Sequence, residues 1–188
     1  MRKLITSVIL ISGCLMVGNV ALSCDKVDEL IDNISVPIPF TIPLDFNAEF
    51  PFATASTTET VTYPEIPVNI DVDAKIKEQY SNFSINNLKA AKLEKFSITA
   101  IEGNAVPLDA ILDAEVFFKT PENGEIKVAT VTGNTNPTVI TFSPTNADLI
   151  NHLKSKQNSF FLKIKGSKIT AGIMKIKINT GFRVEVGL

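Results

Sequence analysis

A stretch of strict alternation near the N-terminus constrains the fold more than any other feature of the sequence. Every even position of residues 34–52 is apolar, and every odd position is polar or proline. Ten successive apolar residues at a period of two predict a long β-strand with one buried face. The prolines of this stretch all lie at odd positions, namely Pro37, Pro39, Pro43 and Pro51.

The shared parity of the prolines predicts where this strand lies in its sheet. Successive backbone N–H groups point to opposite edges of a strand, so the four missing donors all fall on one edge. We therefore expect an edge strand, or one that switches sheets midway, whose proline-bearing edge faces solvent and discourages pairing with other chains.

Shorter alternating runs continue along the rest of the chain. Residues 121–124, Pro-Glu-Asn-Gly, predict a hairpin turn between strands at 114–119 and 125–131. Residues 145–148 match a capping box that opens a helix with Leu149, Ile150 and Leu153 on its apolar face. The apolar parity changes at Gly172, which predicts a β-bulge there.

These elements amount to eight or nine short strands with no alternation of strands and helices. The pattern predicts an all-β fold: an antiparallel β-sandwich with Greek-key or jelly-roll-like connections and one or two short helices. We expect a single domain over residues 34–188. With 45% hydrophobic residues, the chain can bury a substantial core.

The N-terminus is organised as a secretory signal. Arg2 and Lys3 precede a mainly apolar stretch over residues 4–22, and a polar sequence begins at Cys24. A transmembrane anchor is the alternative, but small polar residues and glycines interrupt the stretch and no positive charge flanks its end. We expect residues 1–23 to be removed. Cys14 and Cys24 are the only cysteines, so the mature domain has no disulfide.

Residues 21–24, Ala-Leu-Ser-Cys, resemble the lipidation box of bacterial lipoprotein precursors. The resemblance implies cleavage before Cys24 and attachment of acyl chains to its thiol. Residues 11–14 also fit such a box, but they leave a hydrophobic region of only seven residues, so we prefer Cys24. Two or three acyl chains would anchor the protein stably.

The acidic residues 25–29 are similar to the segment that follows the lipidated cysteine in many Bacteroidota lipoproteins. We expect residues 24–33 to be an acidic tether or short helix. The order of features along most of the chain resembles a loosely defined set of uncharacterised Bacteroidota lipoproteins. This resemblance implies a lipid-anchored location in the cell envelope, at the periplasmic or surface face of the outer membrane, and a β-sandwich fold. It implies no activity.

The sequence offers little for catalysis by histidine or with a nucleotide. His152 is the only histidine, no Gly-x-Ser-x-Gly is present, and a lone histidine without cysteine partners does not make a common zinc site. Glycine-rich phosphate loops are missing. We expect no cofactor and no metal, and we read His152 as a surface or partly packed side chain.

Two pairs of carboxylates are candidates for an acid–base dyad. Asp109 and Asp113 lie four residues apart, and Asp71 and Asp73 share one face of a predicted strand. With Asn69, the latter pair also has the spacing of calcium ligands, but the loop glycine of such sites is absent. Caps and solvent-facing positions explain these acids better, so we expect a non-enzymatic protein.

Charge is distributed unevenly along the chain. Residues 24–73 carry ten acids and one lysine, whereas residues 154–188 carry seven lysines, one arginine and one acid. A hairpin turning at Gly166 and Ser167 would gather a basic face for an anionic partner such as lipid phosphates or an acidic glycan. Its members would be Lys163, Lys165, Lys168, Lys175 and Lys177.

The alternative for this basic face is a solvated surface neutralised by the acidic N-terminal strand. It predicts that the segment around Asp45, Glu49 and Glu59 lies beside the lysine-bearing strands.

The function that we expect is non-enzymatic binding or scaffolding, with an unknown envelope protein or glycan as partner and the membrane as anchor. The net charge of −2 gives no reason to expect nucleic acid. The alternatives are a carrier or chaperone for an apolar ligand, a carboxylate-based hydrolase, and a structural envelope component.

Overall fold

The computed structural model describes residues 37–188. The expected signal peptide, the lipidation site Cys24 and the tether at 24–33 lie outside the described residues. Within residues 37–188 the chain forms nine β-strands, two short α-helices and two 3-10 turns. The strands are β1 Ile38–Thr54, β2 Thr60–Thr62, β3 Ile66–Pro67, β4 Leu88–Ala100, β5 Ile111–Thr120, β6 Gly124–Val131, β7 Val139–Pro144, β8 Ser159–Gly166 and β9 Thr170–Val186. The helices are α2 Val72–Gln79 and α3 Ile150–Lys154, and the 3-10 turns are Ile85–Asn87 and Leu108–Ala110.

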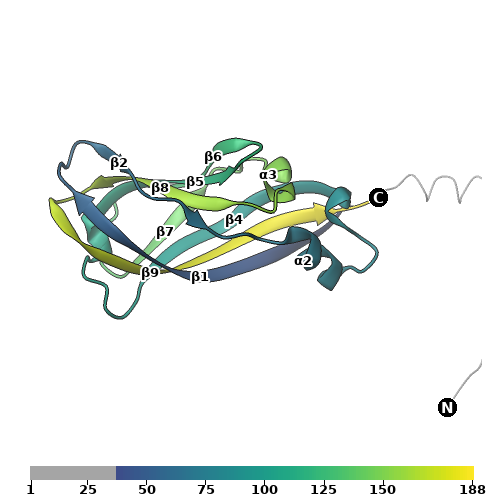
Figure 1. Cartoon of the computed structure of the whole chain (residues 1–188), viewed down its shortest axis with the longest axis horizontal. Coiled ribbons are helices and arrows are strands. Elements are labelled where there is room, and N and C mark those ends of the chain that lie inside the picture. Colours follow the sequence, from purple (N-terminus) through teal and green to yellow (C-terminus); the bar gives the residue numbers. More distant parts are fainter. Residues whose placement is uncertain (1–36) are drawn as a thin grey trace, which may run out of the picture. The chain divides into compact units, whose positions relative to one another are not determined.

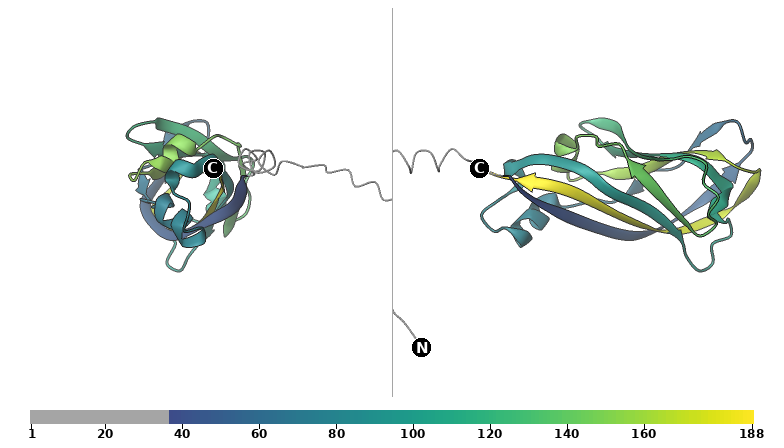
Figure 2. Two further views of the ribbon diagram at one scale, coloured as in Figure 1. Left: turned by 90° about the vertical axis from the view of Figure 1, so that its right-hand side faces the viewer. Right: turned by 180° about the vertical axis from the view of Figure 1, so that it is seen from behind.

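All strand pairs are antiparallel, and they form one curled sheet in the order β1-β9-β4-β7-β6-β5-β8-β2, with β3 also paired to β8 (Figure 1). The sheet has two halves that meet at β6 and β7, where only two residue pairs join them. Figure 2 shows end-on how the strands surround a common interior, with both helices at the end where β9 finishes.

Aromatic rings join the two halves across this interior. Phe96 of β4 contacts Phe160 of β8 with ring centroids 5.2 Å apart, and Phe118 of β5 contacts Phe182 of β9 at 5.5 Å. All four rings are fully buried. The predicted all-β antiparallel fold with few short helices is confirmed, and its facing layers belong to one continuous sheet.

The prediction of an edge strand is confirmed for β1. It pairs with β9 alone, in an unbroken register from Ile38 opposite Val186 to Thr54 opposite Thr170. Odd residues of β1 are exposed, and even residues are buried or half-buried. Because the ladder is continuous despite Pro39, Pro43 and Pro51, its donors come from the even positions.

The predicted bulge at Gly172 is wrong. Gly172 stays in register opposite Phe52, and a Cβ at this position would lie 2.8 Å from Cγ2 of Val106. The glycine therefore makes room for a close contact. The change in apolar parity has another cause: Ile169 and Ala171 are exposed apolar residues on the outer side.

The turn at 121–124 is confirmed, since Thr120 pairs with Gly124 at the start of the β5–β6 hairpin. The predicted capping box is wrong. Thr145 donates its hydroxyl to the carbonyl of Lys127, and the helix begins five residues later, at Ile150. Asp148 does accept a hydrogen bond from the N–H of Ile150.

Candidate functional site

The most distinctive surface feature is a cleft on a free edge of β4. One edge of β4 pairs with β9 along its length, but the other pairs with β7 only at residues 96–99. Beyond that point β7 turns away to pair with β6. Residues 89–93 are therefore left with a single backbone link on this edge, from the N–H of Leu149 to the carbonyl of Ala91 at 2.8 Å.

Two register shifts in the β4–β9 ladder bracket the free edge. One falls between Leu88 and Ala90 and the other between Leu93 and Lys95, so Lys89 and Glu94 have no partner in β9. An extra residue in one strand increases the local twist and re-aims the neighbouring side chains. Both shifts lie in the part of β4 that β7 does not cover.

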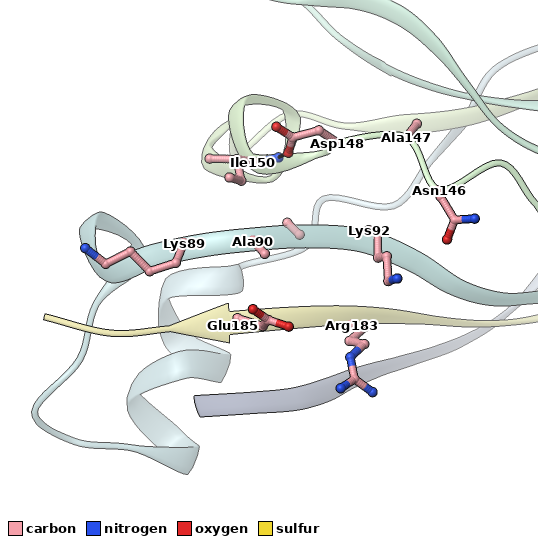
Figure 3. A pocket seen from close by; sticks show the side chains of 10 residues that line it. Lys89, Ala90, Lys92, Asn146, Ala147, Asp148, Ile150, Arg183 and Glu185 are labelled. Carbon is pink, nitrogen blue, oxygen red and sulfur yellow. Dashed lines mark hydrogen bonds between the residues drawn. The ribbon is translucent and has the colours of Figure 1, made fainter. Parts of the chain in front are cut away.

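Two adjoining cavities of about 260 and 470 Å³ occupy the space between β4 and the segment 144–150. Figure 3 shows this segment facing the start of β4, with the side chains of β9 alongside. We call this space the β4 cleft. The cavities share Lys92, Asn146, Arg183 and Glu185.

The β4 cleft presents charges of both signs. Arg183 lies 4.0 Å from Glu94, which also accepts a hydrogen bond from Thr41 of β1 at 2.7 Å. Among the described residues, Lys89, Lys92 and Glu185 form no ion pair. These groups, with the backbone edge, suit binding by polar contacts and hydrogen bonds.

Asn146 stands at the mouth of the β4 cleft in a left-handed backbone conformation, with φ of 60°. Asparagine tolerates this region better than most residues. Non-glycine residues in such conformations are concentrated at ligand sites and switch segments. Sequence reasoning missed this cleft entirely, because it depends on the point where β7 leaves β4.

The structure separates the five lysines of the expected basic face. Lys163 and Lys165 lie on β8, which pairs with β5, β2 and β3, whereas Lys175 and Lys177 lie on β9, which pairs with β1 and β4. The predicted β8–β9 hairpin is therefore wrong, and Lys168 lies in the connection between these strands.

Three of these lysines are paired with acids. The distances are 3.1 Å from Lys163 to Glu125, 3.0 Å from Lys168 to Asp109 and 3.7 Å from Lys175 to Glu49. Lys163 also lies over the ring of Phe117, 4.1 Å from its centroid.

The predicted proximity of the acidic N-terminal segment to the basic strands is confirmed. Glu49 is the register partner of Lys175, and Thr60, which follows Glu59, is opposite Lys165. This arrangement favours the reading of the lysines as a largely neutralised surface, and binding of an anionic partner there stays a prediction.

The candidate carboxylates have structural partners. Asp71 caps α2 by accepting from the N–H of Ala74, and Asp73 pairs with Lys77 at 2.6 Å and accepts from the N–H of Ile85. Asp109 pairs with Lys168, and Asp113 accepts from the N–H of Gly133. In residues 37–188 no cluster of three or more histidine, cysteine, aspartate or glutamate side chains is placed to hold a metal ion.

The expected helical position of His152 is confirmed, on α3, but its side chain is buried, with 8% of the residue exposed. This is deeper than the surface or partly packed position that the sequence suggested. The reason is that Leu149 and Leu153 hold this face of α3 against the core.

A second surface feature lies at the opposite end of the β1–β9 pair. Ile169 is 74% exposed and Ile173 41% exposed, with exposed Pro51, Ala53 and Ala171 beside them. We call these five residues the distal patch. Sheet surfaces that face water are normally polar, and contiguous exposed apolar residues are typical of contact surfaces.

Comparisons with known proteins provide no relative. No protein-family model, no curated protein and no solved structure matches the chain. No helix within the described part of the chain is long and apolar enough to cross a membrane.

Proposed function

We propose that this protein is a lipid-anchored, non-enzymatic binding or scaffolding protein of the bacterial cell envelope. The anchor is supported by the positively charged N-terminus, the apolar stretch at 4–22 and the lipidation-box-like residues that end at Cys24. Acyl chains on Cys24 would hold the domain at the outer membrane through the acidic segment 24–33.

The observation that carries the binding role is the β4 cleft. It combines a free strand edge, two adjoining cavities and the charges of Lys89, Lys92 and Glu185, which form no ion pair within residues 37–188. Free strand edges offer unpaired N–H and C=O groups to a partner, and most proteins cover them. The distal patch adds an apolar contact surface. A scaffold needs such surfaces, whereas an enzyme needs convergent reactive groups.

The alternative of a carrier for an apolar ligand has less support. Five cavities of the described residues, of about 260 to 590 Å³, are open to the surface, and none of them is lined by phenylalanine. Ten of the twelve phenylalanines of the chain belong to the hydrophobic core or pack against it. A hydrolase also has less support, because the candidate carboxylates are engaged in caps and ion pairs.

Site-specific photo-crosslinking in the native envelope tests the binding role. A photoreactive residue replaces Ala90 in the β4 cleft, and in a control protein it replaces exposed Thr62 on β2. We expect adducts of discrete mass from position 90 and none from position 62. Equal adducts from both positions would refute a specific partner at the cleft.

A matched pair of charge reversals sharpens this test. Lys92→Glu changes the β4 cleft, and Lys177→Glu makes the same change on the outer side of β9, at another lysine that has no ion pair with a described residue. The crosslinking yield at position 90 should fall with the first substitution and stay with the second. Equal losses would point to a general effect of charge.

A further inference from the structure

The side chain of His152 is buried, and burial favours its neutral form. The ring packs against Phe118 with centroids 6.3 Å apart, and it donates a hydrogen bond to the carbonyl of Gly124. Nε2 is buried and has no hydrogen-bond partner among the described residues. A neutral imidazole carries one N–H and the protonated ring carries two, so the protonated ring needs a second acceptor.

Protonation would add an N–H to Nε2 at a place where no described residue offers an acceptor, and it would bury a positive charge. Both changes disfavour the closed position of the ring. Burial accordingly lowers the pKa of His152 below its ordinary value of 6.5, and the hydrogen bond to Gly124 and the charge of Asp148 oppose this only in part.

Asp148 is the charged group that acts on His152. The other charged groups on the elements around α3 are exposed or already paired. Lys89 and Lys92 on β4 and Glu122 and Glu125 near the β5–β6 turn are exposed, Lys119 on β5 pairs with Glu65, and Asp73 on α2 pairs with Lys77.

The helix that carries His152 is small and is held at few points. α3 has five residues, and the side chain of Asp148 accepts a hydrogen bond from the first N–H of the helix, at Ile150. Leu149 and Leu153 are buried, and the backbone bond from Leu149 to Ala91 fastens the segment to β4. The side chain of Asn123 donates to the carbonyl of Asn151 at 3.0 Å. Short helices depend on such tertiary contacts for their stability.

α3 and the residues before it form the wall of the β4 cleft opposite the strand edge. We propose that His152 is a proton-sensitive latch on this wall: the neutral ring holds α3 against β4 and β5, and the protonated ring releases it and opens the edge at residues 89–93. The identity of a partner that binds the opened edge rests on the proposed function. The release of α3 on protonation of His152 needs no partner.

Two measurements on the full chain test the latch. His152 is the only histidine, so the imidazole C–H signals in NMR spectra report its titration without ambiguity. Hydrogen exchange of residues 149–154 reports the release of α3. For a ring that titrates near 6.5 once released, the opening constant should rise up to about 30-fold between pH 7.5 and pH 5.0 after correction for intrinsic exchange.

Amides of Ile98 and Ile178, which are register partners in the part of the β4–β9 ladder away from the β4 cleft, should keep their protection over the same pH range. His152→Gln should abolish the pH dependence at residues 149–154. Exchange there that is independent of pH in the natural chain, or equally dependent on pH in His152→Gln, would overturn the latch.

Asp148→Asn is the conservative second variant, because an asparagine oxygen can still accept from Ile150. Loss of the negative charge should lower the titration midpoint of His152 in the closed position and increase the opening at low pH, and an unchanged midpoint would contradict the proposed electrostatics. Since no partner takes part, these results stand apart from the crosslinking test of the β4 cleft.

Discussion

A methyl group added at Gly166 should destabilise the contact between the end of β8 and the end of β1. Gly166 ends β8, and an ideal Cβ there would lie 2.7 Å from Cγ2, 2.9 Å from Cβ and 3.1 Å from Oγ1 of Thr54, at the end of β1. Thr54 is buried. Its hydroxyl donates to the carbonyl of Lys168 at 2.6 Å and accepts from the N–H of Thr170 at 3.2 Å.

These contacts set the magnitude for Gly166→Ala. Real Cβ contacts are rarely closer than 3.0 Å, so Thr54 must shift, and it cannot shift far without losing a hydrogen bond. Overpacking costs about 1–3 kcal/mol and a lost hydrogen bond about 1 kcal/mol. We expect the free energy of unfolding to fall by about 2–4 kcal/mol, which lowers the Tm by roughly 4–16 °C for a domain of this size.

A double-mutant cycle measured by urea unfolding checks the cause. Thr54→Gly removes all three atoms that the new Cβ would meet, so Gly166→Ala should cost much less in that background, with a coupling energy of roughly 1–3 kcal/mol. Additive effects of the two substitutions, or a loss below about 0.5 kcal/mol for Gly166→Ala alone, would refute the steric argument.

Three further predictions concern the core, the free edge and pH. Phe118→Ala should lower the free energy of unfolding in urea by about 3–5 kcal/mol, because the ring is fully buried between both halves of the sheet, and a loss below 1 kcal/mol would contradict that packing. Pro43→Thr should restore a donor on the free edge of β1 and increase self-association in light scattering, whereas a monomer at all concentrations would argue against a protective role for the proline. Hydrogen bonds from Lys77 and from the backbone of Ile85 lower the pKa of Asp73. Its contribution to stability should therefore be present above its ordinary pKa of 3.8 and lost as the pH falls. Asp73→Asn should be less stable than the natural chain at pH 7 but not at pH 2.5, and an equal loss of stability at both pH values would contradict this.

Local sequence patterns predicted those parts of the fold that depend on the residues of a single segment. The alternation at 34–52 identified β1 and its exposed edge, because side-chain parity and missing donors are properties of one strand. The Pro-Glu-Asn-Gly turn identified the β5–β6 hairpin for the same reason.

Patterns failed where the outcome depends on distant partners. Gly166 and Ser167 looked like a hairpin turn, but β8 and β9 join different halves of the sheet. A break in alternation at Gly172 fits either a bulge or an apolar outer surface, and only the neighbouring strand distinguishes them. The β4 cleft could not be predicted, because it forms where β7 stops pairing with β4 and pairs with β6. No local sequence motif indicates this change of partner.

The mass of the mature protein's N-terminus, isolated from the envelope of cells that make the natural chain, tests the central claim most directly. Lipid anchoring predicts a chain that begins at Cys24, carries acyl chains on that residue and partitions into the detergent phase. Cys24→Ser should abolish both the acylation and the partitioning. An unmodified mature chain in the aqueous phase, or a Cys24→Ser variant that still partitions into detergent, would contradict the account.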